Sequence, residues 1–150
     1  MSALTNPNSL VAKFLVGWYG FFQTGHFLFN GLYLLHPGTP PFPQPPEGWL
    51  SQTVHLLNGM AASDLVNALL SLVFVYGYFT RAKWRMWLGT LTLAISVYAM
   101  TVFAYGTIGM GAWIGNLFGY LWSYILFVPV VMLFGLVSKW TVKGSSEIVR

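Results

Sequence analysis

Four long apolar tracts dominate the sequence, roughly at residues 9–35, 52–80, 84–107 and 114–138. Each is longer than the about 20 residues that an α-helix needs to cross the hydrocarbon core of a bilayer. The composition, 56% hydrophobic and only 7% charged, leaves too few polar groups to coat a water-soluble globule. The spanning strands of a β-barrel would be shorter and would alternate in polarity. The sequence therefore predicts an all-α, integral membrane four-helix bundle, with residues 1–150 forming one transmembrane domain.

The basic residues are confined to three places: the two ends of the chain and the connection between the second and third tracts. They are Lys13, Arg81, Lys83, Arg85, Lys139, Lys143 and Arg150. Cytoplasmic segments of membrane proteins carry an excess of Lys and Arg, and four spans place both termini on the same side. We therefore expect cytoplasmic N and C termini. Contact with anionic lipid explains the positive charge, so no nucleic-acid partner is expected.

The connection between the first two tracts, residues 36–50, is rich in proline. Proline fixes φ and lacks a backbone donor, so this segment should be an extended external loop. It serves either as a spacer or as a docking surface for a partner.

The chain contains no cysteine. This excludes disulfides, thiolate metal sites, iron–sulfur clusters and dithiol redox chemistry. No phosphate-binding glycine loop, HExxH helix or GxSxG elbow is present either. Composition and motifs therefore leave open whether the protein is an enzyme.

Small residues recur every four positions around the start of the fourth tract, at Gly111, Gly115, Gly119 and Ser123. On a helix this spacing forms a smooth ridge that a second helix can approach closely. The ridge predicts close packing within the bundle, with self-association or docking of another subunit as the alternative.

Five polar or aromatic residues of the first tract follow the helical repeat, with spacings of four, three, four and three. They are Tyr19, Gln23, His26, Asn30 and Tyr33. Such spacings place side chains on one face of a helix. We expect this face to point into the bundle while the Phe and Leu residues of the same tract point outward.

Asp64 is the only acidic residue within the four tracts, and a carboxylate in hydrocarbon costs roughly 2.5 kcal/mol or more unless it finds partners. From the helical rise, Asp64 and His26 lie at similar depths, about 3 and 4.5 Å from the midplane. We therefore expect an Asp64–His26 pair. The rest of the predicted hydrogen-bond network consists of Gln23, Asn30, Asn67 and one or both of Tyr98 and Tyr124.

Two interpretations of this network remain open at the level of sequence. The network either fixes helix packing alone or lines a small polar cavity for a quinone headgroup, a proton or another ligand. Intramembrane ionisable groups often mark such pathways. The helical rise places His55 some 12 Å from the level of His26, so a haem between them is not expected. His36 and His55 near the external loop are weak candidates for metal ligands.

The segment SDLVNALLSLVFVYGYFTRAKWR, residues 63–85, resembles the second span of DoxX-like small membrane proteins, with an early acid, a late glycine and a following arginine. The segment GWYGFFQTGHFLFNGLYLL, residues 17–35, resembles their glycine-punctuated, aromatic first span, and Lys13 takes a place where the family usually has a basic residue. The sequence differs from the family in having Asp64 where glutamate is more usual, Lys rather than Arg at position 13, and a proline-rich loop.

The resemblance implies a compact four-helix bundle of a bacterial plasma membrane, of a kind that accompanies quinone-linked membrane oxidoreductases. We therefore expect a small multi-pass subunit or accessory component of such an assembly, whose partners are the lipid bilayer and larger membrane subunits. The alternative is a stand-alone small-molecule or lipid-binding protein, a transporter or a lipid-modifying enzyme that uses the same cavity. The substrate, the electron partner and the oligomeric state cannot be predicted from the sequence.

Overall fold

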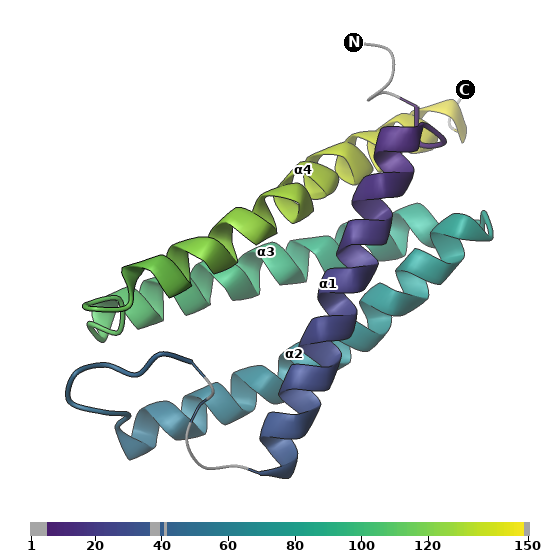
Figure 1. Ribbon diagram of the computed structural model, residues 1–150. Coiled ribbons are helices and arrows are strands. Elements are labelled where there is room, and N and C mark those ends of the chain that lie inside the picture. Colours follow the sequence, from purple (N-terminus) through teal and green to yellow (C-terminus); the bar gives the residue numbers. More distant parts are fainter. Residues whose placement is uncertain (1–5, 37–39, 41, 149–150) are drawn as a thin grey trace.

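The computed structural model describes residues 6–36, 40 and 42–148, with side chains up to Lys143. This part of the chain is all-helical, as predicted, and contains four helices: α1 (Leu10–Leu35), α2 (Ser51–Phe79), α3 (Arg85–Gly109) and α4 (Leu117–Ile148) (Figure 1). The first three match the predicted tracts to within two residues at each end. The fourth begins three residues later than predicted and continues to Ile148, past the predicted end at 138.

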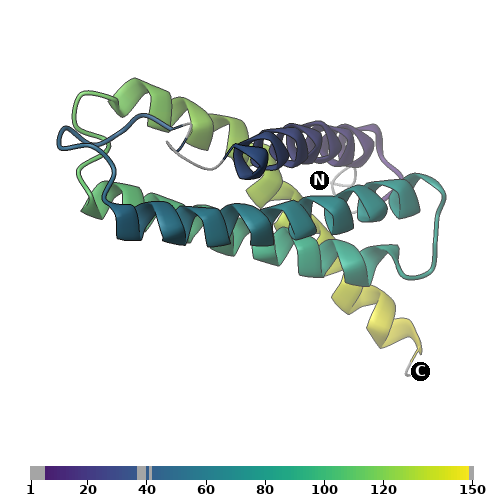
Figure 2. The ribbon, with the colours of Figure 1, turned by 90° about the horizontal axis from the view of Figure 1, so that it is seen from below.

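The first turn of α1, the last turns of α4 and the α2–α3 turn (residues 80–84) lie at one end of the bundle, which we call the turn end. The proline-rich loop and the α3–α4 connection lie at the opposite end, which we call the loop end (Figure 2). The described basic side chains, from Lys13 to Lys143, therefore belong to one end. Arg150 lies outside the described residues.

Three helices are long and apolar enough to cross a membrane: α2, α3 and residues Leu117–Lys143 of α4. Helix α1, with 26 residues, is also long enough. It is less apolar because Gln23, His26 and Asn30 interrupt it. The structure thus agrees with the predicted helices, and three of the four have the composition of membrane spans.

The core of the bundle lies towards the turn end. A cluster of buried apolar side chains from α1 to α4 fills this half, including Val16, Phe74, Leu93, Leu133 and Val137. Gly89 on α3 allows the ring of Phe74 to approach so closely that a Cβ at position 89 would lie 2.4 Å from its Cε2 atom. The turn half is therefore close-packed around small residues.

At the loop end the proline-rich loop bridges helices that are distant in sequence. The ring of Phe42 lies 5.7 Å from that of Phe29 on α1 and 4.9 Å from that of Phe103 on α3. The Tyr120 hydroxyl on α4 donates a hydrogen bond to the Pro43 carbonyl at 2.7 Å. The loop thus connects α1, α3 and α4. Residues 37–39 and 41 of the predicted loop lie outside the described residues.

Candidate functional site

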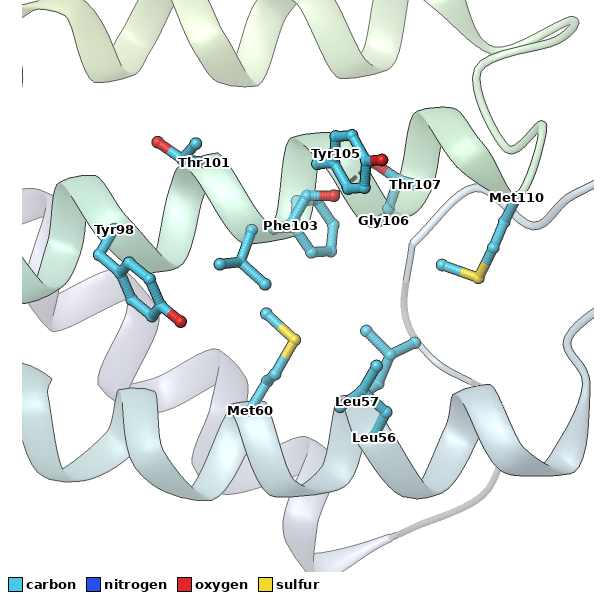
Figure 3. Close-up of a pocket in the computed structure, with 11 residues that line it drawn as sticks. Leu56, Leu57, Met60, Tyr98, Thr101, Phe103, Tyr105, Gly106, Thr107 and Met110 are labelled. Carbon is cyan, nitrogen blue, oxygen red and sulfur yellow. Dashed lines mark hydrogen bonds between the residues drawn. The ribbon is translucent and has the colours of Figure 1, made fainter.

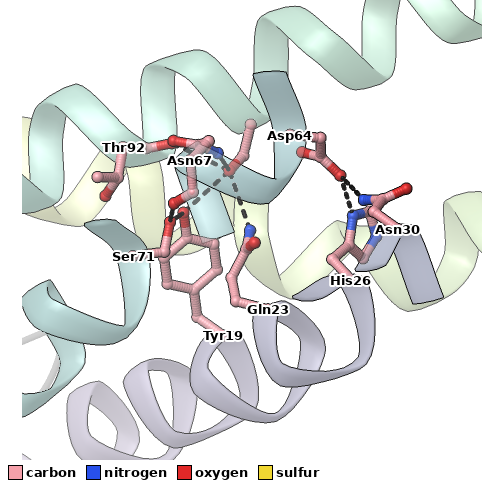
Figure 4. Close-up of polar contacts among 9 residues, drawn as sticks. Tyr19, Gln23, His26, Asn30, Asp64, Asn67, Ser71 and Thr92 are labelled. Carbon is pink, nitrogen blue, oxygen red and sulfur yellow. Dashed lines mark hydrogen bonds and ion pairs between the residues drawn. The ribbon is translucent and has the colours of Figure 1, made fainter. Parts of the chain in front are cut away.

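His26 on α1 and Asp64 on α2 form the expected pair. His26 Nδ1 lies 2.6 Å from Asp64 Oδ2, and Asn30 Nδ2 donates to the same oxygen at 2.7 Å (Figure 4). Asn30 lies four residues after His26, so both side chains leave α1 on the same face. We call His26, Asn30 and Asp64 the His–Asp cluster.

The His–Asp cluster is only partly enclosed. The side chains of His26 and Asp64 are 39% and 19% exposed, whereas Asn30 is buried. Phe22 covers one face of the imidazole, with the two ring centroids 4.5 Å apart. Because Nδ1 faces Asp64, Nε2 is the ring nitrogen that a ligand could reach. The cluster can therefore exchange a proton or a hydrogen bond with a molecule at the surface of the bundle.

A second polar cluster lies one helical turn closer to the turn end. It is built around Ser96 of α3, whose Oγ atom accepts from Gln23 Nε2 at 3.1 Å and from Asn67 Nδ2 at 3.0 Å. The Tyr19 hydroxyl lies 2.9 Å from Ser96 Oγ and 2.8 Å from Ser71 Oγ. We call these five residues, with the Thr92 carbonyl that accepts from Ser96, the Ser96 cluster (Figure 4). All of its side chains are buried.

The prediction that Gln23 and Asn67 complete a hydrogen-bond network with the His–Asp pair is wrong. Their amide nitrogens turn to Ser96 instead. The physical reason is the helical rise, since three residues from His26 to Gln23 and from Asp64 to Asn67 span about 4.5 Å. The predicted inward face of α1 is confirmed for Tyr19, Gln23, Asn30 and Tyr33, which are buried, whereas its fifth member, His26, is 39% exposed.

Tyr98 and Tyr124 do not join either cluster, contrary to the prediction. The Tyr98 side chain is 71% exposed and lines an apolar groove between α2 and α3, beside Met60 and Val102 (Figure 3). The groove has a volume of about 470 Å³. Tyr124 packs its ring against Trp113, and its buried hydroxyl has no hydrogen-bond partner among the described residues. Equal depth along a helix does not determine the direction in which a side chain points.

The predicted ridge of small residues on the fourth helix is also wrong. Gly111 and Gly115 precede α4 and adopt left-handed conformations, with φ of 69° and 79°. These are conformations that glycine adopts at little cost, so both residues shape the α3–α4 turn. Gly119 lies on α4 but faces Pro43 of the loop, and Ser123 is exposed. The fourfold spacing begins in a turn, which is why it builds no continuous helix face.

The weak metal candidates His36 and His55 are both exposed at the loop end. Among the described residues, no group of three or more His, Cys, Asp or Glu side chains could hold a metal ion. The His–Asp cluster itself has one imidazole, one carboxylate and one amide. Its chemistry is therefore that of hydrogen bonding and proton exchange.

Sequence reasoning did not identify Ser71, Thr92 and Ser96 as parts of a polar site. Their spacing carried a signal, since Asp64, Asn67 and Ser71 are separated by three and four residues and Thr92 and Ser96 by four. These intervals place side chains on one helix face. The signal is weak because a hydroxyl residue on a helix can bond to its own backbone, as Ser71 does to the Asn67 carbonyl at 2.7 Å.

Comparison with protein-family models, with curated proteins and with solved structures finds no match to this chain.

Proposed function

We propose that the chain crosses a membrane four times, with α1 as the first span and with both termini in the cytoplasm. Three helices have the length and apolar composition of spans. The apolar side chains of α1 that point away from the bundle, including Phe14, Phe21 and Leu32, are exposed. So large an apolar surface favours lipid as its surroundings. The basic residues gathered at the turn end support a cytoplasmic location for that end.

We further propose that the His–Asp cluster binds the polar head of a small lipid-soluble molecule. The proposed ligand class is the quinones. The observation that carries this proposal is a His26–Asp64 pair at 2.6 Å whose imidazole is 39% exposed. A quinone carbonyl accepts a hydrogen bond and a quinol hydroxyl donates one. An imidazole whose Nδ1–H donates to the Asp64 carboxylate accepts a hydrogen bond at Nε2 when it is neutral and donates one there when it is protonated.

The protein then acts as a small subunit or accessory component of a quinone-linked membrane oxidoreductase, in a bacterial plasma membrane. The resemblance of residues 17–35 and 63–85 to the first two spans of DoxX-like proteins supports this role. The chain itself has no cysteine for thiol redox chemistry. Larger partner subunits would supply the redox centres.

The second candidate is a stand-alone lipid-binding or lipid-modifying protein. The groove between α2 and α3 favours it, because Leu56, Leu57 and Met60 face Val102 and Phe103 across a space of about 470 Å³. A groove with apolar walls suits a hydrocarbon chain. The two candidates differ in partners: a subunit co-purifies with larger proteins after mild detergent extraction, and a stand-alone protein does not.

Binding of a short-chain benzoquinone to the purified protein tests the proposed site. We expect His26→Gln and Asp64→Asn each to weaken binding about tenfold. The first removes the imidazole that bonds to the head, a bond worth about 1.5 kcal/mol, and the second weakens the contact that holds this imidazole in place. Tyr98→Phe is the matched control, because Tyr98 lies outside both polar clusters. Equal affinity in wild type and all three variants would remove the site.

A further inference from the structure

The Ser96 cluster has more hydrogen-bonding atoms than its own residues can satisfy. The side-chain oxygens Gln23 Oε1 and Asn67 Oδ1 are buried and have no partner among the described residues. The two side chains are only 1% and 2% exposed. Burying a polar atom without a partner is destabilising, because the atom loses its hydrogen bonds to water. Native structures therefore pair such atoms with protein or with ordered water.

Proton counting shows that the cluster cannot supply the missing partners. The Ser71 hydroxyl donates to the Asn67 carbonyl, so the Tyr19 hydroxyl is the donor towards Ser71. Ser96 Oγ accepts from both amides and has one proton of its own, which goes to the Thr92 carbonyl at 3.0 Å or to Tyr19. A hydroxyl has one donor and two acceptor sites, all of which are then used.

Reversing one of the amides does not change this result. If the Gln23 or Asn67 amide is turned over, its oxygen can take the single Ser96 proton, but the oxygen of the other amide then still lacks a donor. In either orientation at least one buried amide atom requires a neighbour from outside the protein. Water can pair with either amide atom, because it both donates and accepts hydrogen bonds. A cation could bind only the amide oxygens.

We propose that the Ser96 cluster is an internal water-binding site, open towards the His–Asp cluster and closed towards the turn end. Gln23 lies three residues from His26, and Asn67 three from Asp64, a separation of about 4.5 Å along each helix. On that side the polar side chains of His26 and Asp64 are partly exposed. On the other side, Val16, Phe74 and Leu93 are buried and apolar.

The proposed water lies next to the His–Asp cluster inside the bundle. On its turn side the polar region ends at an apolar layer. A proton or hydrogen bond at His26 can be relayed one turn inward and no further, because the apolar layer offers no partner. The site therefore communicates with one side of the bundle only. This inference uses the packing of the helices and does not depend on a quinone or on an oxidoreductase partner.

Single thiols test the proposal in the full-length protein, reconstituted without ligand. The natural chain has no cysteine, so one S–H vibration reports one position. Ser71→Cys and Ser96→Cys place the reporter in the Ser96 cluster. Ala12→Cys places it in the apolar core, where Ala12 is also buried. Infrared spectra after transfer to D₂O follow the exchange of S–H to S–D.

We expect both cluster thiols to exchange at least about tenfold faster than the thiol at position 12, because exchange in a dry core requires local opening. Cluster thiols that exchange as slowly as the core thiol would overturn the water site. A core thiol that exchanges as fast as both cluster thiols would overturn the apolar closure. If one cluster variant fails to fold, the other reports the same site. Quinone binding by Asp64→Asn is measured separately, so failure of the proposed function remains distinguishable.

Discussion

The two halves of the bundle differ in packing and in chemistry. The turn half is filled by apolar side chains around Phe74 and Gly89, and the approach of the helices there leaves no room for a Cβ. The loop half contains the His–Asp cluster, a groove between α2 and α3, and a loop that bridges the helix ends. The packed core and the proposed ligand site thus lie in different halves of the same four helices.

The arrangement of α1 and α4 produces this difference. Near the middle of the bundle the two helices touch, where Trp18 Nε1 donates to the Leu126 carbonyl at 3.1 Å and Phe22 packs against Phe127. Beyond this contact α1 diverges from α4 towards the loop end (Figure 1). His26 lies just past the point of divergence, which explains its exposure. Functional sites commonly occupy the less tightly packed part of a fold.

Gly89→Ala should have the largest effect on stability, because Gly89 lies in the closely packed turn half. The new Cβ would lie 2.4 Å from Cε2 of the buried Phe74 ring, so the ring or the helix backbones must move. We expect a loss of about 3 kcal/mol in the free energy of unfolding, measured by circular dichroism in mixed micelles of increasing SDS content.

Gly135→Ala is the control for this substitution. No atom lies within 4 Å of the Cβ that it would add to α4. It should leave stability unchanged or raise it by up to about 1 kcal/mol through helix propensity. If Gly89→Ala is as stable as wild type, the turn half is not rigidly packed.

The His–Asp cluster should couple energetically across α1 and α2 in the loop half. In a double-mutant cycle of His26→Ala and Asp64→Asn, we expect an interaction free energy of about 1–2 kcal/mol, because the pair is hydrogen-bonded and only partly screened by solvent. A cycle of His26→Ala with Tyr98→Ala should be additive within about 0.5 kcal/mol, since the two side chains share no partner among the described residues. Additivity in the first cycle would contradict a stabilising pair.

The helices of both halves could be predicted from the sequence because length and apolar composition determine them. The first three helices lie within two residues of the predicted spans. The start of α4 could not be predicted, because Gly111 and Gly115 satisfy both a helical ridge and a turn until their φ angles are known. Membrane crossing and the side on which the termini lie stay predictions.

Helical periodicity predicts which residues of the site share one face of a helix, and only that part of the site could be predicted from the sequence. Periodicity placed His26 and Asn30 on one face of α1, and depth along the helix brought Asp64 to the same level. It gave no information about rotation of α3 and α4, so Tyr98 and Tyr124 were wrongly assigned to the network. The role of Ser96 depends on the contact between three helices, which one sequence does not specify.

Tyr120→Phe tests whether the loop contributes to the stability of the loop half. It removes the hydrogen bond from the α4 hydroxyl to the Pro43 carbonyl. We expect the free energy of unfolding to fall by about 1 kcal/mol, the usual net value of one such bond. Tyr124→Phe is the matched control on the next turn of α4, where the hydroxyl has no partner among the described residues. It should be neutral or slightly stabilising. Equal effects of the two substitutions would show that the loop is not held by Tyr120.

The smallest expected effect is a gain in stability at the turn end. Arg81, two residues after the end of α2, has a φ of 59°, a left-handed conformation that costs an L-residue about 1 kcal/mol and that glycine adopts freely. The backbone bond from Ala82 N to the Gly77 carbonyl, 2.8 Å long, closes this turn and does not need the arginine side chain. Arg81→Gly should therefore raise the free energy of unfolding by about 0.5 kcal/mol, after the entropy that glycine adds to the unfolded chain. Lys83→Gly removes the same charge from the same turn without relieving a left-handed residue, so it should not stabilise. A gain in both variants would show that loss of a positive charge, and not release of the left-handed backbone at Arg81, raises the free energy of unfolding.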